Sequence, residues 1–389
     1  MFFHVGPSIV PGVGWNTFQD DLASELKMKH PKPLQGTGKL KDFKLHLHVD
    51  PNVPPVAPKL RRVSFALREK VSAKIDELRR EDNIERLEGP TTWASPVVVA
   101  PKPSEEIRLC VDMRRASEAI VRERLPMPTV DEVLEELNGC TVFSKLDLRW
   151  EFHKIELHVN SRDITTFIIH EGVFRYERLN FGVSVAPEKY QHVIRQAKAG
   201  TEGVVNFVDD VICHGKIVLE HEQRLHKLLA KLEENNLTFN GDKCNFRMNK
   251  IVFMGILLSQ HGVGPTEEKE WAVKDASRPT TPSQVRSFLG LVGFSSRFIS
   301  DFAYIAEPLR ALTRNGVKFE WTNVQEKAFQ KRKEQLAEES ILAYFNKTAH
   351  TRVIADASPV GLSGVFSSGG EWVEPYCVLC RSISDVKRR

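Results

Sequence analysis

The chain has 389 residues, of which 41% are hydrophobic and 27% are charged, so its composition excludes an intrinsically disordered chain and allows two or three packed units. Its formal net charge is only +4, so any nucleic-acid binding has to come from local basic patches and not from a polycationic whole. Six cysteines are scattered along the chain, which favours a reducing compartment over a disulfide framework.

These residues show neither a membrane-spanning segment nor a signal peptide. No apolar stretch approaches the roughly 20 residues that a membrane-spanning helix needs. The N-terminal run from Met1 to Gly6 lacks the basic-then-apolar order of a signal peptide. Cys377 and Cys380 have the spacing of a zinc-binding pair, but no second pair or nearby histidine completes a site. We therefore expect a soluble intracellular protein with no membrane partner.

The first part of the chain predicts a linker followed by a small α/β unit. Residues 1–60 contain runs rich in Pro and Gly, which predict an extended segment. Between residues 64 and 80 the apolar positions follow helical spacing, which predicts an amphipathic helix. The β-branched runs at Val97–Ala100 and Ile107–Val111 predict two strands of a hairpin.

The middle of the chain predicts strands that alternate with helices. Thr129–Glu132 has the pattern of a capping box at the start of a helix. A strand is predicted up to Asp147 and another through Thr165–Ile169, and a helix is predicted from Pro187. A hairpin and a leucine-rich helix around Leu228 follow. This order favours an α+β fold, in which helices cover one face of antiparallel strands.

Two adjacent carboxylates, Asp209 and Asp210, stand between short β-branched runs, which predicts an exposed hairpin tip that a divalent cation can reach. The same dipeptide at Asp20–Asp21 precedes a helical run and is better explained as a helix cap. Asp147 ends another strand-like run upstream. A two-metal phosphoryl-transfer site needs such a set, because carboxylates have to bridge both ions. We therefore expect Asp147 and Asp209 to lie within a few ångströms of each other; surface or capping acids are the alternative.

Several further runs surround these acids in a fixed order. They are Trp93–Val99, Arg108–Asp112, Phe143–Leu148, Phe181–Val183 with Ala186–Pro187, and Arg286–Leu291. From about residue 36 to its C-terminus, the chain thereby resembles the reverse transcriptases of gypsy-type LTR retrotransposons. The resemblance implies a right-hand polymerase with fingers, a ferredoxin-like palm and a thumb, followed by an incomplete RNase H-like α/β segment. The expected parts are a linker (1–60), fingers and palm (61–260), thumb and connection (261–345) and the start of RNase H (346–389).

The resemblance also implies the reaction and its catalytic residues. Asp147 and Asp209 would hold two Mg²⁺ ions, for which Mn²⁺ can substitute, and Asp210 would be a weaker or structural member of the set. Lys243 matches the lysine that protonates the pyrophosphate leaving group, although a plain turn lysine is the alternative. The implied activity is RNA-directed DNA polymerisation, from dNTPs to the 3′-hydroxyl of a primer on an RNA or DNA template.

Substrate-binding residues follow from the same resemblance. Lys102 and Arg108 match fingers residues that grip the triphosphate, although both also fit solvated surface charges. Phe152 matches the aromatic that excludes a 2′-hydroxyl, with an ordinary core aromatic as the alternative. Phe181, Gly182 and Gln191 complete the implied dNTP site. The implied primer grip is Phe253, Met254 and Gly255, where a buried strand would look similar.

Some positions depart from the family pattern. Asp356 matches the first metal-binding acid of RNase H but the later acids are absent, so we expect a remnant without hydrolytic activity. Glu151 replaces the Gly before the gate aromatic, and in an extended strand Lys154 would point away from it. Phe207 replaces the usual Tyr of the acidic box, and Arg332 replaces a Leu on the apolar side of a helix. These departures favour an alternative: a catalytically impaired relic or a co-opted nucleic-acid-binding protein.

The resemblance sets the expected surroundings as well. A retrotransposon polymerase acts in a cytoplasmic particle and reaches the nucleus, so both locations are expected. These residues contain no protease, nucleic-acid knuckle or integrase motif, and they define no oligomeric state.

Overall fold

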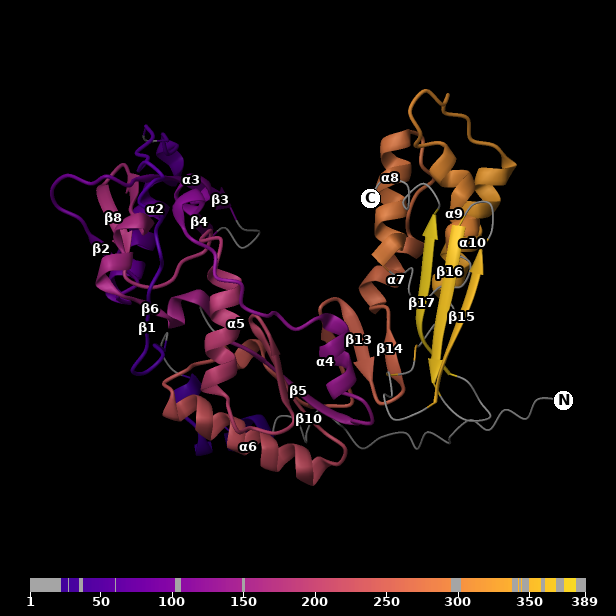
Figure 1. The fold of residues 1–389 in the computed structure, drawn as a ribbon, viewed down its shortest axis with the longest axis horizontal. Helices are drawn as coiled ribbons and strands as arrows, with labels where there is room; N and C mark the ends of the chain where they lie inside the picture. The colour runs from indigo at the N-terminus through magenta and orange to yellow at the C-terminus, as the bar shows by residue number, and fades with distance from the viewer. Residues whose placement is uncertain are drawn as a thin grey trace. The chain divides into compact units, whose positions relative to one another are not determined.

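The computed structural model describes residues 22–26, 28–34, 38–59, 61–101, 106–148, 151–294, 302–337, 342, 344, 350–357, 361–368 and 374–382. The chain divides into two compact units (Figure 1). Unit 1 contains residues 1–127, 144–213 and 221–247, and unit 2 contains residues 128–143, 214–220 and 248–389. Among the described residues, no helix has the length and apolar character needed to cross a bilayer.

A five-stranded sheet forms one part of unit 1. Its strand order is β2 (Ile84–Arg86), β8 (Gly172–Tyr176), β7 (Phe167–Ile169), β3 (Ser95–Pro101) and β4 (Ile107–Val111). Strands β3 and β4 pair antiparallel, with Ala100 opposite Arg108, so the hairpin predicted here is confirmed. Helix α2 (Phe65–Arg80) buries Val71 and Ile75, which lie on the apolar face that the helical spacing predicted.

A second, four-stranded sheet carries the acidic residues. Its strand order is β11 (Asn245–Met248), β5 (Val142–Asp147), β10 (Asp210–Gly215) and β9 (Val204–Phe207). Strands β9 and β10 pair antiparallel, and the last pair is Phe207 opposite Asp210. Val208 and Asp209 therefore form the tight turn between the two strands, and the predicted hairpin is confirmed.

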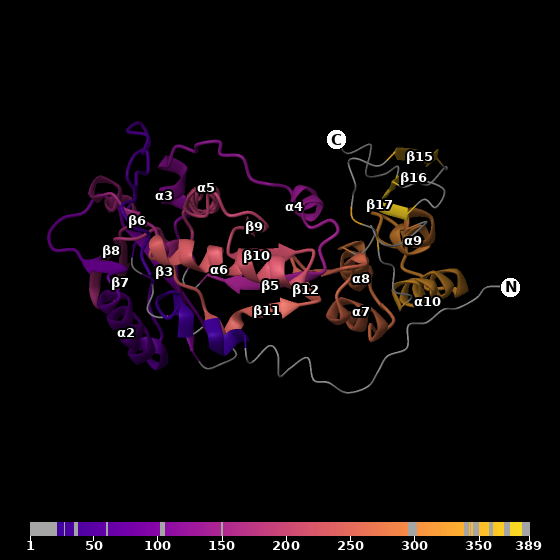
Figure 2. The same ribbon diagram turned by 90° about the horizontal axis from the view of Figure 1, so that it is seen from below.

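Two helices lie beside this sheet (Figures 1 and 2): α5 (Ala186–Ala197) and α6 (Val218–Glu234). Helix α5 has Pro187 in its first turn, as predicted. Helix α6 buries Leu225 and Leu228, which belong to the same hydrophobic core as residues of the sheet. The short helix α3 (Arg114–Ala119) follows β4 directly.

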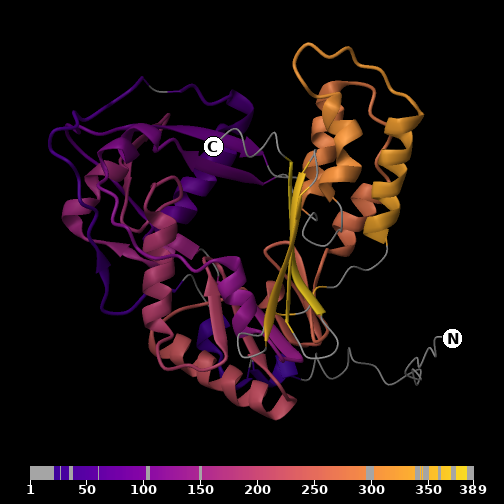
Figure 3. The ribbon, with the colours of Figure 1, turned by 45° about the vertical axis from the view of Figure 1, so that its right-hand side comes forward.

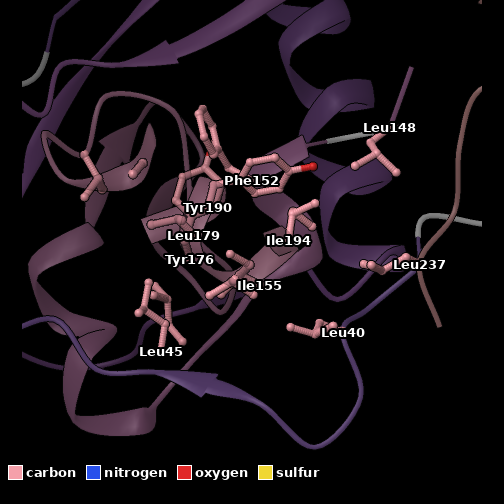
Figure 4. Packing of buried hydrophobic residues seen from close by; sticks show 14 of the residues in the cluster. Leu40, Leu45, Leu148, Phe152, Ile155, Tyr176, Leu179, Tyr190, Ile194 and Leu237 are labelled. Carbon is pink, nitrogen blue, oxygen red and sulfur yellow. The ribbon is translucent and has the colours of Figure 1, made fainter. Parts of the chain in front are cut away.

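The core of unit 1 includes part of the segment that was predicted to be a linker. Leu40 and Leu45 lie in the cluster that also contains Ile155 (Figure 4), and Leu22 and Leu26 belong to the same cluster. Strand β1 (Lys44–Leu45) pairs in parallel with β6 (Glu156–Leu157). The expectation of an extended linker is therefore wrong for these residues. The prediction rested on the Pro and Gly runs, whereas the scattered leucines pack into the core. Only turns and irregular backbone occur over residues 50–59.

An extended strand was expected at Glu151–Lys154, but the segment after β5 contains short 3-10 helices. They are η2 (Glu151–Lys154), η3 (Val159–Ser161) and η4 (Asp163–Thr165). The strand predicted through residues 165–169 begins only at Phe167. Because the backbone over Glu151–Lys154 is a 3-10 turn, the expectation of an extended strand there is wrong. Lys154 is fully buried, and its Nζ donates to Thr238 Oγ1 at 2.9 Å.

Unit 2 begins with a helix whose start agrees with the sequence. Helix α4 (Val130–Glu136) has Thr129 as its N-cap: the Thr129 hydroxyl accepts from the Glu132 N–H and the Glu132 carboxylate accepts from the Thr129 N–H, so the predicted capping box is confirmed. A three-stranded antiparallel sheet follows later in the chain. Its strands are β12 (Lys250–Phe253), β13 (Ile256–Ser259) and β14 (Gly262–Gly264).

Helices make up the next part of unit 2. They are α7 (Glu267–Lys274), α8 (Pro282–Phe294), α9 (Phe302–Ala311) and α10 (Asn323–Ala337). Their shared core contains Val285, Phe288 and Val292 of α8. Arg332 in α10 is fully buried, in agreement with its predicted place on the apolar side of the helix.

The last described part of unit 2 is an antiparallel sheet of β15 (Thr351–Ala357), β16 (Gly361–Ser368) and β17 (Glu374–Ser382), which lies next to α9 (Figure 3, yellow). Asp356 lies in β15 with its backbone opposite Ser363. The side chain of Asp356 lies outside the described part of the structure, so its RNase H role stays a prediction.

Candidate active site

Three aspartates meet at one end of the four-stranded sheet. Asp147 is the last residue of β5, Asp209 lies in the turn between β9 and β10, and Asp210 is the first residue of β10. The N–H of Leu148 donates to the carbonyl of Asp209 at 3.4 Å, so the end of β5 touches the turn. The backbones beside Asp147 and Asp209 therefore meet, while the distance between the two carboxylates stays a prediction. Asp20–Asp21 lies outside the described residues.

Lysine side chains partly neutralise this acidic cluster. Lys145 Nζ lies 2.9 Å from Asp210 Oδ2. Burial raises the pKa of Asp210; Lys145 opposes this shift, and the charges of Asp209 and Asp147 add to it. Lys243, in η5 (Gly241–Lys243), has its Nζ 3.9 Å from Asp147 Oδ2. Asp210 thus has Lys145 as a close partner, and Asp147 lies near Lys243.

The acidic cluster fits a divalent cation that is shared with a substrate. Among the described residues, no three or more His, Cys, Asp and Glu side chains are already arranged as a metal site. Mg²⁺, however, is usually bound by one or two carboxylates together with water and substrate phosphates. Asp147 and Asp209 can supply two carboxylates of this kind, while Lys145 holds the third one.

Helix α5 holds the turn that carries Asp209. Val208 has a φ of +52°, a conformation that is rare for a β-branched residue. Gln191 of α5 is 3% exposed; its Nε2 donates to the Asn206 carbonyl at 2.9 Å and its Oε1 accepts from the Val208 N–H at 2.7 Å. The prediction that placed Gln191 in a dNTP site missed these contacts. A glutamine within the buried face of an amphipathic helix was the available signal.

Phe152 is both a core residue and a neighbour of the predicted nucleotide loop. The ring of Phe152 is 7% exposed and meets Tyr190 edge-on at 5.4 Å between centroids (Figure 4). The ring of Phe181 lies edge-on at 4.8 Å and is half exposed. Phe152 therefore has a fixed orientation, set by α5 on one side and by Phe181 on another. Its role against ribonucleotides stays a prediction.

Gly182 is needed for a close approach of two backbone segments. It has a φ of +96°, and a Cβ at this position would lie 3.0 Å from the Val111 carbonyl oxygen and 3.2 Å from Met113 Cγ. The Ser117 hydroxyl donates to the Gly182 carbonyl at 3.1 Å. The loop after Phe181 is thus fixed against the end of β4, while its contact with a nucleotide stays a prediction.

One of the two predicted triphosphate ligands lies in strand β4 of the β3–β4 hairpin. Arg108 is exposed in β4, and Lys102 lies outside the described residues. Sequence reasoning missed the adjacent ion pair, in which Arg114 Nε and Nη2 donate to the two carboxylate oxygens of Asp112 at 2.8 Å. This pair and Arg61 hold the pKa of Asp112 well below its usual range, although burial opposes them. The Asp-x-Arg spacing was the available signal.

The predicted primer grip lies at the turn between β12 and β13 in unit 2. Phe253 is fully buried, in line with the buried-strand alternative, whereas Met254 is 41% exposed. Met254 and Gly255 both have positive φ, and the Gly255 carbonyl accepts from Lys269 Nζ at 2.8 Å. An exposed turn of fixed shape results, and its contact with a primer stays a prediction.

The fold defines a right-hand polymerase, and solved structures share it. A foamy viral protease-reverse transcriptase in complex with double-stranded DNA has a TM-score of 0.83 at 19% identity, covering 98% of this chain and 70% of that chain. A foamy viral protease-reverse transcriptase in complex with an RNA/DNA hybrid has a TM-score of 0.82 at 20% identity, covering 97% of this chain and 53% of that chain. The predicted fold class is confirmed.

Family models and curated relatives identify the parts of the chain. Residues 100–258 match the model for reverse transcriptase (RNA-dependent DNA polymerase), and residues 321–389 match the RNase H-like domain found in reverse transcriptase. The chain therefore carries a reverse transcriptase domain followed by an RNase H-like segment.

Two relatives show the wider context of these domains. The Retrovirus-related Pol polyprotein from transposon 412 of Drosophila melanogaster is 30% identical over 321 residues, which are 80% of this chain and 26% of the relative. The Transposon Tf2-3 polyprotein of Schizosaccharomyces pombe is 28% identical over 358 residues, 91% of this chain and 26% of the relative. The chain is thus related to transposon Pol polyproteins and spans about a quarter of their length.

Proposed function

We propose that this chain is the RNA-directed DNA polymerase of a gypsy-type LTR retrotransposon. The observation that carries the proposal is the meeting of Asp147 with the Asp209 turn, inside the stretch that matches the reverse transcriptase model. The proposed substrates are dNTPs and a primer paired with an RNA or DNA template. Double-stranded DNA and RNA/DNA hybrid in the solved structures of the same fold support such a duplex as the partner.

In the proposed reaction, Asp147 and Asp209 would hold two Mg²⁺ ions. Bound there, the ions would lower the pKa of the primer 3′-hydroxyl and stabilise the leaving oxygen. The Asp210 carboxylate forms an ion pair with Lys145 at 2.9 Å. Asp210 would therefore stabilise the turn through this ion pair. Lys243, whose Nζ is 3.9 Å from Asp147 Oδ2, is close enough to the acids to give a proton to the pyrophosphate.

The substrate side of the proposal depends on the fingers hairpin and the gate. Arg108, exposed on β4, presents a forked guanidinium that suits triphosphate oxygens, and Lys102 would add a point charge. Phe152 excludes a 2′-hydroxyl by its bulk, because Tyr190 and Phe181 prevent the ring from turning away. Met254 at the β12–β13 turn would contact the primer.

Primer extension by the purified chain on RNA and DNA templates tests the proposal. We expect Asp147→Asn and Asp209→Asn to lower extension at least about 100-fold, because each removes a carboxylate ligand of the proposed Mg²⁺ ions. Asp210→Asn should have a smaller effect. Asp76→Asn, at an exposed carboxylate of α2, is the matched control and should leave extension unchanged. Chelation should abolish extension, and Mg²⁺ or Mn²⁺ should restore it.

The same assay separates the proposed enzyme from a non-enzymatic alternative. Glu151, in place of the family's Gly, and Phe207, in place of its Tyr, favour that alternative. If the parent chain binds primer–template duplex tightly but extends no primer under any metal condition, the chain is a nucleic-acid-binding relic. If it neither binds nor extends, both proposals are wrong.

We propose cytoplasmic particles, and the nucleus, as the location of the chain. The relation to transposon Pol polyproteins supports this location. Co-sedimentation of the tagged chain with its own RNA, in cytoplasmic and nuclear fractions, tests it; a chain found only free of RNA would contradict it.

A further inference from the structure

We propose that Gln191 is a positioning residue for the catalytic turn and does not bind the incoming nucleotide. The inference rests on the proposed polymerase function, and it changes the role that the sequence resemblance implied for Gln191. Two hydrogen bonds between the Gln191 amide and the β9–β10 hairpin support it.

The turn needs an external support because its backbone is strained. Val208 has a φ of +52°, and a β-branched side chain disfavours this left-handed conformation. Such a conformation persists only when the surrounding structure holds it. The Val208 N–H donates to Gln191 Oε1 at 2.7 Å, so Gln191 holds the residue directly before Asp209.

Both the NH₂ group and the oxygen of the Gln191 amide form hydrogen bonds with the hairpin. Gln191 Nε2 donates to the Asn206 carbonyl at 2.9 Å, two residues before Val208. Gln191 and Asn206 are 3% and 5% exposed, so water cannot replace these hydrogen bonds without a change in packing. A side chain in this place has to donate at one end and accept at the other, and glutamine does both.

Helix α5 thereby connects the turn with the gate. The residue before Gln191 is Tyr190, whose ring contacts Phe152 at 5.4 Å between centroids. Successive residues of one helix thus support the aromatic gate and the acidic turn. Because the buried amide of Gln191 is already hydrogen-bonded to the hairpin, Gln191 acts on the reaction through the position of Asp209.

The two roles predict different kinetic changes. If Gln191 positions the turn, Gln191→Met should lower kcat by about 10- to 100-fold, since small displacements of reacting groups have effects of this size. The KM for dNTP should stay within about twofold, and the Mg²⁺ concentration for half-maximal rate should rise. If Gln191 binds the nucleotide, the KM for dNTP should rise instead.

Gln191→Glu is the second variant, because it keeps the size of the side chain and the acceptor for Val208. It replaces the donor that faces the Asn206 carbonyl by an oxygen, so we expect a loss of kcat as well. Gln196→Met, at an exposed position of the same helix, is the control and should behave like the parent. Circular dichroism and thermal unfolding identify any variant that fails to fold.

Hydrogen–deuterium exchange of the peptide that contains Val208 provides a readout without activity. We expect faster exchange in both Gln191 variants and parent-like exchange in Gln196→Met. Unchanged exchange and unchanged kcat, or a raised KM for dNTP with an unchanged kcat, would overturn the proposal. A parent chain without polymerase activity would instead contradict the proposed function, and faster exchange in the variants would still support the contact between Gln191 and the turn.

Discussion

Replacing Gly182 by alanine should destabilise unit 1 through two separate effects. The first is conformational, because the φ of +96° lies in the left-handed region, where an L side chain costs roughly 1–2 kcal/mol. The second is steric, because the new Cβ would lie 3.0 Å from the Val111 carbonyl oxygen and 3.2 Å from Met113 Cγ. Overpacking of this kind costs about 1–3 kcal/mol. The expected total loss in the free energy of unfolding is therefore about 2–5 kcal/mol.

Gly200→Ala separates the two effects. Gly200 has a φ of +81°, but a Cβ there would meet nothing within 4 Å, so only the conformational loss of about 1–2 kcal/mol is expected. Urea unfolding of the parent and both variants, monitored by tryptophan fluorescence and circular dichroism, measures the difference. In primer extension, only Gly182→Ala should raise the KM for dNTP, because it displaces the loop that carries Phe181.

Equal losses in the two variants would refute the steric part of this reasoning. It would mean that the end of β4 moves away from residue 182 without cost. A stable Gly182→Ala variant with an altered KM would indicate that Gly182 is required by the substrate and not by the fold.

Three further changes have defined outcomes. Arg332→Leu should lower the free energy of unfolding by about 1–3 kcal/mol, because Arg332 is fully buried and the group that it contacts would lose a polar partner, whereas Lys331→Leu on the exposed side of α10 should change it by less than about 0.5 kcal/mol. Burial lowers the pKa of His153 to about 3 from 6.5, with Arg178 and Lys74 adding to the shift. Below pH 6.5 the unfolded chain takes up a proton that the folded chain does not, so stability should fall by about 2 kcal/mol from pH 8 to pH 5, and urea unfolding of His153→Gln should show a shallower fall. Glu151→Gly should increase dNTP use by up to about 100-fold, because a like charge ~6 Å from the triphosphate costs on the order of 2–3 kcal/mol at an effective dielectric of ~20; equal primer extension by the parent would contradict this.

Local patterns in the sequence predicted local structure well. The capping box at Thr129, the buried face of α2 and the β9–β10 hairpin depend on residues that are close in the chain, so spacing alone could find them. The proximity of Asp147 and Asp209 was also predictable, because the family resemblance supplied the fold that brings them together.

Contacts between distant segments could not be predicted in this way. Lys145 and Asp210 lie on neighbouring strands, and their ion pair depends on the register of β5 against β10. Gln191 meets Val208 only because α5 lies beside the hairpin. Leu22 and Leu26 enter the core of unit 1 through tertiary packing, which Pro and Gly elsewhere in the segment do not prevent.

The strand order β11-β5-β10-β9 has a consequence for synthesis of the chain. Strand β5 carries Asp147 in the middle of the sheet, yet one of its two neighbours, β11, begins only at Asn245. While the ribosome makes the intervening residues, one edge of β5 has no partner strand, and such edges pair readily with other chains. A nascent chain that stalls before Asn245 should therefore aggregate more readily than one released after β11.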